Sequence, residues 1–153
     1  EFSDKEVDNQ TLSTLLWAAY GVNRPNGLRT IPTALNQKDL KIYVFKKDGI
    51  WLYNAEEHAI HPISEIDYRS IFQTQDYMKD VPVILLYTGK NKDYASLHAG
   101  SAYQNVNLFA TANNMSAVVR GYFDKEAVQK VLGLTEDEHI IISQAIGWRK
   151  GMT

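Results

Sequence analysis

The chain has 153 residues, of which 44% are hydrophobic and 22% charged, a composition typical of a folded globular domain. A chain of this length buries roughly 68–70% of the surface that its unfolded form exposes, enough for one hydrophobic core. Sixteen basic and eighteen acidic residues give a net charge of −2 without a basic cluster, so nucleic acid is not an expected partner. The lack of cysteine excludes disulfides and thiolate chemistry, and no run approaches the ~18 apolar residues of a membrane span.

The first predicted element is an amphipathic helix that begins after Asp8 or Asn9, either of which can cap its free amides. Its apolar positions recur at the spacing of one helix face: Leu12, Leu15, Leu16 and Ala19. Gly21 stands where helices often end in a left-handed residue, so we expect that conformation there. Residues 22–37 then hold too many prolines, glycines and asparagines for regular structure, and loops of this length are usually functional.

Short runs rich in β-branched and aromatic residues predict the strands of a sheet. They lie at residues 40–45, 50–53, 59–63, 83–88, 117–120 and 140–146. Between the first two runs, Lys47-Asp48-Gly49 is typical of a hairpin. The run at 83–88 is continuously apolar, which indicates a central strand buried on both faces. We expect a central, mostly antiparallel sheet of about five strands.

Two more helices are predicted in the second half of the chain. One spans residues 94–113, about 20 residues or roughly 30 Å, with its apolar face at Ala95, Ala99, Ala102, Val106 and Phe109. Small residues line its first half, so another helix or subunit can approach closely. The other helix spans 125–132, with Asp124 as a candidate N-cap and Gly133 closing it. Helices flanking such a sheet define the α+β class.

Two separated segments carry a family resemblance. The first runs from Leu15 to Arg24 and on to Thr30–Gln37, and the second is Val118–Asp124. In this order they resemble the nitroreductase-like FMN flavoproteins. In that family the first segment is a helix that feeds a polar loop across a dimer interface, and the second is a strand end whose amides face the flavin. The resemblance implies one nitroreductase-like flavoprotein domain over residues 1–153, working as a homodimer.

The resemblance also implies which residues contact FMN. The polar loop matches the family pattern Pro-Ser-x-x-Asn-x-Gln, with threonine in the serine position, at Pro32, Thr33, Ala34, Asn36 and Gln37. The strand end matches at Val119, Arg120 and Gly121, where glycine lets the backbone approach a flat ligand. The alternatives are a short helix capped by the loop amides and a plain strand-to-helix turn.

The FMN phosphate needs cationic donors. After the last strand, Arg149 and Lys150 are the nearest match to the family's basic residue, and the alternative is a solvated charged tail. Relatives carry a further Arg-Arg-Ser-x-Arg element, which would stand immediately before Glu1-Phe2. We therefore expect residues to precede Glu1 in the natural protein. The compartment stays open between the cytoplasm and, if a leader was removed, the periplasm.

Other motifs point to weaker hypotheses. Arg24 and Arg29 flank the loop and could steer an anionic nicotinamide cofactor or an acidic substrate, although loop arginines are more often solvated. His58 and His61 lack the helical spacing of a zinc site. His98 shares a helix with Ser101, but no nucleophile elbow accompanies them.

The function that follows is an FMN-dependent oxidoreductase. The family implies that NAD(P)H reduces the flavin and that an electron-poor acceptor, such as a nitroaromatic or a quinone, then reoxidises it. Two alternatives remain open at this stage. One is the flavin-dependent dehydrogenase branch that oxidises peptide azolines, which shares the Ala-Ala-Tyr-Gly helix end and the Arg-Thr-x-Pro loop. The other is a cofactor-free dimeric binding scaffold of the same fold, which the missing arginine element motivates.

Overall fold

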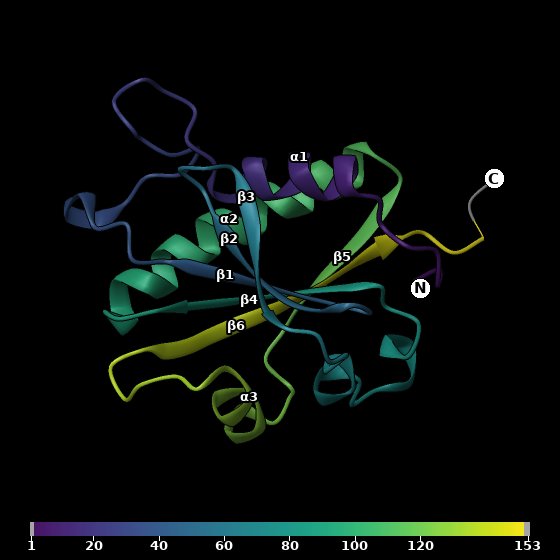
Figure 1. Ribbon diagram of the computed structural model, residues 1–153. Coiled ribbons are helices and arrows are strands. Elements are labelled where there is room, and N and C mark those ends of the chain that lie inside the picture. The colour runs from purple at the N-terminus through teal and green to yellow at the C-terminus, as the bar shows by residue number, and fades with distance from the viewer. Residues whose placement is uncertain (1, 152–153) are drawn as a thin grey trace.

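The computed structural model describes residues 2–151 (Figure 1). Its helices are α1 (Asn9–Tyr20), α2 (Lys92–Ala112) and α3 (Lys125–Leu132), with short 3₁₀ turns η1 (Ala34–Asn36), η2 (Arg69–Phe72) and η3 (Asp76–Met78). Its strands are β1 (Lys41–Lys46), β2 (Gly49–Asn54), β3 (Ala59–Ser64), β4 (Val83–Gly89), β5 (Met115–Arg120) and β6 (His139–Trp148). The α+β class predicted from the sequence is confirmed.

All six strands form one sheet, in the order β3-β2-β1-β4-β6-β5. Every neighbouring pair is antiparallel, so the expected mostly antiparallel sheet is confirmed, with six strands where about five were expected. β4 lies in the interior of the sheet and is buried along its whole length, as its apolar run predicts. The edges are β3 and β5, and the second of these edges carries residues 119 and 120 of the predicted site.

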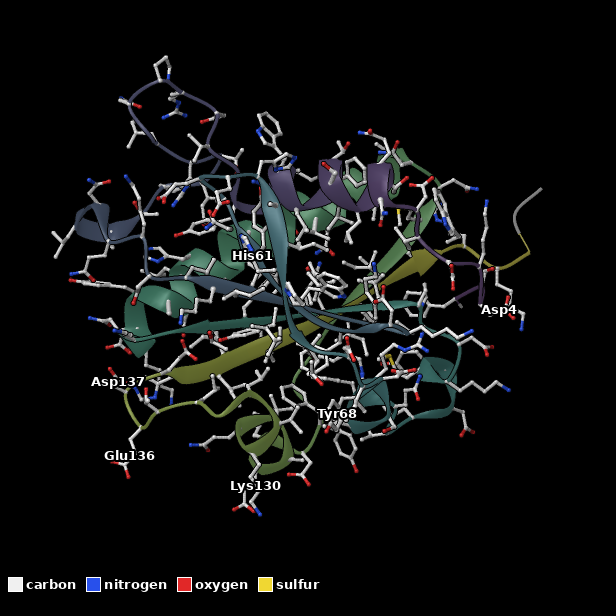
Figure 2. All side chains as sticks on the ribbon, viewed as in Figure 1. Asp4, His61, Tyr68, Lys130, Glu136 and Asp137 are labelled. Atoms are coloured by element: carbon white, nitrogen blue, oxygen red, sulfur yellow. The ribbon has the colours of Figure 1, made fainter. Side chains whose placement is uncertain are left out.

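The molecule has three layers, with α1 and α2 on one face of the sheet and α3, η2 and η3 on the other (Figure 1). β4 supplies side chains to both cores, because successive residues of a strand point to opposite faces. Leu85 and Tyr87 belong to the core under α1 and α2, whereas Ile84 and Leu86 belong to the core on the α3 side. Figure 2 shows Tyr68 and Lys130 on the α3 side, and Asp4 beside the two chain ends.

The ends of α1 show one confirmed and one wrong prediction. Asp8 caps the helix by accepting a hydrogen bond of 2.7 Å from the Thr11 amide. Hydrogen bonding to the Thr11 side chain, and then to its amide, lowers the pKa of the Asp8 carboxyl. Gly21 follows the helix as expected, but its backbone is extended, with φ −67° and ψ 155°, and not left-handed. Glycine fits there because a β-carbon would lie 2.6 Å from the Trp17 carbonyl oxygen. Close packing, and not backbone handedness, therefore explains this glycine.

The predicted hairpin joins β1 and β2, with Lys46 opposite Gly49 and a two-residue turn between them. Gly49 has φ +138°, and a β-carbon there would run into the Ser64 carbonyl of the neighbouring strand. The turn and the close approach of β3 thus both require glycine at this position.

The two later helices lie close to their predicted bounds. Asn91 caps α2 by accepting from the Tyr94 amide, and Asp124 caps α3 by accepting from the Ala127 amide. Gly133 ends α3 in the left-handed conformation, with φ 64°, as predicted. Ala95, Ala99 and Ala102 of α2 are buried and let the helix pack against α1 and the sheet. Within residues 2–151, no helix has the length and apolar character needed to cross a membrane.

Candidate functional site

The loop between α1 and β1 is fixed to the body of the protein by Arg29. The Arg29 side chain is only 6% exposed, lies 4.8 Å over the Tyr20 ring and makes an ion pair of 3.2 Å with Glu56. Burial raises the pKa of the Tyr20 phenol, and the Arg29 charge partly opposes that shift. Arg29 is therefore a structural residue of the loop, whereas Arg24 is exposed.

Beyond Arg29, the loop presents the predicted flavin-contacting residues on a strained turn at η1. Leu35 and Asn36 both have left-handed backbone, with φ 52° and 56°. The short helix considered in the sequence is a 3₁₀ turn with Gln37 at its C-cap, where the Gln37 backbone amide donates to the Ala34 carbonyl, and the Thr33 hydroxyl makes no capping bond. Asn36 and Gln37 are exposed, as is Pro32, while Thr33 and Ala34 are half-buried. Such strain in non-glycine residues is concentrated at functional sites.

At the end of β5, the side chain of Arg120 and the backbone of Gly121 have different roles. The Arg120 side chain is 5% exposed and donates hydrogen bonds to the Phe72 carbonyl at 2.7 Å and to the Thr74 and Gln75 side chains at 2.8 Å. It therefore supports the η2–η3 segment on the α3 side of the sheet. Gly121 is exposed, and a β-carbon built on it would meet only Ile142 Cδ1, at 3.6 Å. The backbone of Gly121 is therefore open to solvent on this side, whereas the Arg120 guanidinium is packed inside the protein.

The predicted phosphate residues lie at the other end of β5. The Arg149 amide donates to the Asn114 carbonyl, and its Nε donates to the Met115 carbonyl, both at 3.2 Å. The Lys150 side chain that follows is exposed. Met115 and Arg120 are five residues apart on an extended strand, or about 16 Å at ~3.3 Å per residue. One edge strand therefore links the two predicted contact regions.

The predicted site thus forms two separated groups within one chain. Residues 119–121 and 149–150 share the β5 edge, whereas η1 lies at the end of the molecule opposite the two chain termini (Figure 1). The Ala34 amide contacts His98 on α2, which covers one face of the sheet, whereas the Phe72 carbonyl that receives Arg120 belongs to η2 on the other face. A single chain does not bring Thr33 or Asn36 to Gly121.

His98 is a residue of this region whose role the sequence did not reveal. Its Nε2 lies 2.8 Å from the Ala34 amide nitrogen, and its ring is buried. The only sequence pattern that points to it is its place on the buried face of α2, next to Ala99 and three residues after Ala95. A polar residue on an apolar face predicts a buried hydrogen bond but not its partner.

The other histidines serve a different part of the molecule. His58 links Ser13 of α1 to Tyr53 of β2 through two contacts of 2.8 Å, beside a pocket of about 350 Å³. Burial raises the pKa of Tyr53 to about 12, so this residue is a neutral phenol at neutral pH. His61, on β3 in Figure 2, faces Glu57 at 3.4 Å instead. In residues 2–151, no group of three or more acidic, histidine or cysteine side chains is placed to hold a metal ion.

The antiparallel sheet covered by helices on both faces defines a protein of the α+β class. The model of the nitroreductase family matches residues 1–148. The chain therefore belongs to the nitroreductase family, a family of oxidoreductases.

Individual relatives agree with this assignment. The Methanocaldococcus jannaschii protein MJ1384, which is provisionally named a nitroreductase, is 27% identical over 157 aligned positions covering 89% of this chain and 79% of the relative. A crystal structure from Ralstonia eutropha, provisionally named in the same way, has a TM-score of 0.91 at 29% identity, over 99% of this chain and 78% of that one.

Two more distant structures share the fold. A chain of the Escherichia coli microcin synthetase McbBCD complex, solved with truncated pro-MccB17, has a TM-score of 0.84 at 18% identity, over 97% of this chain and 67% of that one. A provisionally named nitroreductase from Desulfovibrio desulfuricans, solved in complex with FMN, has a TM-score of 0.68 at 20% identity, over 98% and 79% of the two chains.

Proposed function

We propose that the protein is an FMN-dependent oxidoreductase that passes reducing equivalents from NAD(P)H to a nitroaromatic or quinone-like acceptor. The observation that carries this proposal is the match of residues 1–148, nearly the whole chain, to the nitroreductase family. The solved FMN complex of a protein with this fold supports the choice of cofactor. Residues 1–153 then act as a single nitroreductase-like flavoprotein domain.

The residues at the β5 edge fit a flat ligand. At Gly121 the backbone is exposed and the space on its α-carbon is open, so a ring can approach the peptide amides of Val119, Arg120 and Gly121. Of these amides, those that are not paired with β6 would hold the pyrimidine edge of the ring. FMN supplies a two-electron carrier whose potential depends on such hydrogen bonds. The role of this chain is to orient two flat substrates in turn, without a strong acid or base of its own.

At the other end of β5, Arg149 and Lys150 would hold the FMN phosphate. Arg149 is fixed by its bonds to the Asn114 and Met115 carbonyls, which position its guanidinium at the sheet edge. Guanidinium and ammonium groups are the side chains that bind phosphate best. The proposed ring contacts and phosphate contacts lie at opposite ends of one strand, as the ring and the phosphate lie at opposite ends of FMN.

The second half of the site would come from a neighbouring subunit. We infer a homodimer in which Pro32, Thr33, Ala34, Asn36 and Gln37 of one chain reach the flavin held by the other. The distance between η1 and the end of β5 within one chain supports this arrangement, since neither group completes a site alone. Leu97 and Leu108 are 65% and 61% exposed and lie three turns apart on one face of α2, where a second subunit would cover them.

Purification without added flavin tests the cofactor. We expect a yellow protein that releases FMN on denaturation, and that oxidises NADH or NADPH when a nitroaromatic or a quinone is supplied. A colourless protein that also fails to bind supplied FMN would contradict the enzyme and favour the cofactor-free scaffold. Both nicotinamide cofactors are assayed separately, because the described residues do not distinguish them.

A second candidate is a flavin-dependent dehydrogenase of peptide azolines. The similarity of fold to a chain of the microcin synthetase complex favours it, over 97% of this chain. The same purified protein is therefore assayed with azoline-containing peptides under oxygen. Peptide oxidation without nitroaromatic or quinone reduction would select this candidate over the first.

A further inference from the structure

His98 is bound to the turn that carries the predicted flavin contacts. Its imidazole is 2% exposed, and its Nε2 lies 2.8 Å from the backbone nitrogen of Ala34. A backbone N–H can only donate, so Nε2 must be the acceptor in this bond. The neutral ring therefore carries its hydrogen on Nδ1.

Asp39 faces the other ring nitrogen. Its Oδ1 lies 3.9 Å from His98 Nδ1, and among residues 2–151 neither atom has a hydrogen-bond partner. The second carboxylate oxygen, Oδ2, accepts from the Lys90 and Asn91 amides at 3.0 and 3.2 Å and so ties Asp39 to the start of α2. A fixed carboxylate on this side favours the tautomer with hydrogen on Nδ1, directly or through one bridging water.

The turn depends on such external support. Leu35 and Asn36 are consecutive non-glycine residues with φ 52° and 56°, a conformation that persists only where the surroundings determine it. Leu35 is 76% exposed, so packing of its side chain within the chain does not hold the turn. Two hydrogen bonds lie within the turn, from the Asn36 amide to the Thr33 carbonyl and from the Gln37 amide to the Ala34 carbonyl. They do not fix the position of the turn relative to the rest of the protein. The bond to His98 joins the turn to α2.

We propose that His98 is the positioning residue of this turn. By accepting from the Ala34 amide, His98 fixes the positions of the Thr33 hydroxyl and the Asn36 amide relative to the flavin of the neighbouring subunit. Asp39 stabilises the His98 tautomer that this hydrogen bond requires. This inference rests on the proposed function, in which residues of the turn contact FMN. No proton transfer by His98 is involved.

Two amide variants give a matched test. In His98→Gln the side-chain amide reaches the position of Nε2 and can accept from Ala34, whereas in His98→Asn it reaches only the position of Nδ1. Both place an uncharged amide in the same buried environment, so they differ mainly in reach. Circular dichroism checks that each variant keeps the fold before it is compared with the wild type.

The first readout is independent of flavin. Loss of one hydrogen bond corresponds to about a tenfold change in an equilibrium, so we expect the Ala34 amide to exchange with deuterium about tenfold faster in His98→Asn and near the wild-type rate in His98→Gln. Equal exchange in all three proteins would overturn the proposal. In the wild type, ¹⁵N chemical shifts are expected to show hydrogen on Nδ1, and a hydrogen on Nε2 would overturn it without any variant.

The second readout connects the turn to the cofactor. We expect the Kd for FMN to rise about tenfold in His98→Asn and to recover in His98→Gln, in step with the exchange rates. Faster exchange with unchanged FMN affinity and turnover would overturn the positioning role. If the wild type itself binds no FMN, the proposed function fails and the positioning role with it, while the exchange data still report separately whether His98 supports the turn.

Discussion

A substitution at Gly121 can separate an effect on ligand binding from an effect on folding. Its φ lies outside the left-handed range, and a β-carbon would meet Ile142 at an ordinary 3.6 Å. The glycines packed against other groups differ, since a β-carbon on Gly147 would lie 2.8 Å from Pro82 Cδ. Folding therefore tolerates a side chain at position 121, and the proposed flavin does not.

We predict that Gly121→Val lowers FMN affinity at least about tenfold, because its methyl groups occupy the space where the ring would approach the backbone. The free energy of unfolding should change by less than about 1 kcal/mol, as at other sites away from the packed core. Fluorescence titration with FMN and urea denaturation measure the two effects. Gly147→Ala is the control, expected to destabilise the protein, and unchanged affinity in Gly121→Val would refute the site.

The buried phenol of Tyr43 makes stability depend on high pH. Burial, together with the nearby Glu138 carboxylate, raises its pKa to about 12. Because the unfolded value is near 10, Tyr43 contributes stability that is present below pH 10 and lost as the pH rises toward 12. We predict that Tyr43→Phe reduces the loss of stability between pH 10 and 12, measured as the urea midpoint at each pH. Tyr53, whose pKa is also about 12, remains as a second contributor.

Among the elements, the β2–β3 hairpin is tied to α1 through one residue of its turn. His58 bonds to Ser13 on α1 and to Tyr53 on β2, although its own backbone is left-handed, with φ 49°. β3 is an edge strand, so this bridge supports an otherwise weakly held part of the sheet. The two hydrogen bonds offset the cost of the strained backbone.

We predict that His58→Ala lowers the free energy of unfolding by about 1–2 kcal/mol, since it removes two hydrogen bonds of roughly 0.5–1.5 kcal/mol each. His58→Gly loses the same bonds but relieves the left-handed strain, and should be less destabilising than alanine. Urea denaturation measures both variants, and hydrogen exchange should be faster in β3. Stabilities equal to the wild type in both would show that the bridge contributes nothing.

For the whole molecule, we expect the exposed face of α2 to decide the oligomeric state. Leu97 and Leu108 are exposed on one face of α2, with Ser101 and Gln104 between them, and a second subunit would cover this face in the proposed homodimer. Ile66 is similarly exposed, at 57%, but follows β3 and lies outside α2. An aspartate on the α2 face would place a charge in the interface, where leaving it unpaired is costly.

We therefore predict that Leu108→Asp converts the dimer to a monomer and lowers FMN affinity in parallel, whereas Ile66→Asp changes neither. Analytical ultracentrifugation gives the oligomeric state, and an FMN titration gives the affinity. A wild-type monomer that nevertheless binds FMN tightly would contradict a site shared between subunits.

Much of the fold could be predicted because its determinants are local. The caps Asp8 and Asp124, the turn before Gly49 and the left-handed Gly133 each act within a few residues. The reason for Gly21 could not be predicted from its position after the helix. The backbone there is extended, and this conformation leaves no room for a β-carbon beside Trp17. The family resemblance located the candidate site residues, and their contact with FMN stays a prediction.

The sequence by itself determined the helices, the strands and the hairpin, since hydrophobic periodicity and capping depend on residues that are close together in the chain. Only the tertiary structure decided the sheet order, the burial of the Arg120 side chain and the bond from Ala34 to His98. Those last two contacts join residues 48 and 64 positions apart, so no local pattern encodes them. They form because packing leaves a buried donor or acceptor that must find its partner across the fold.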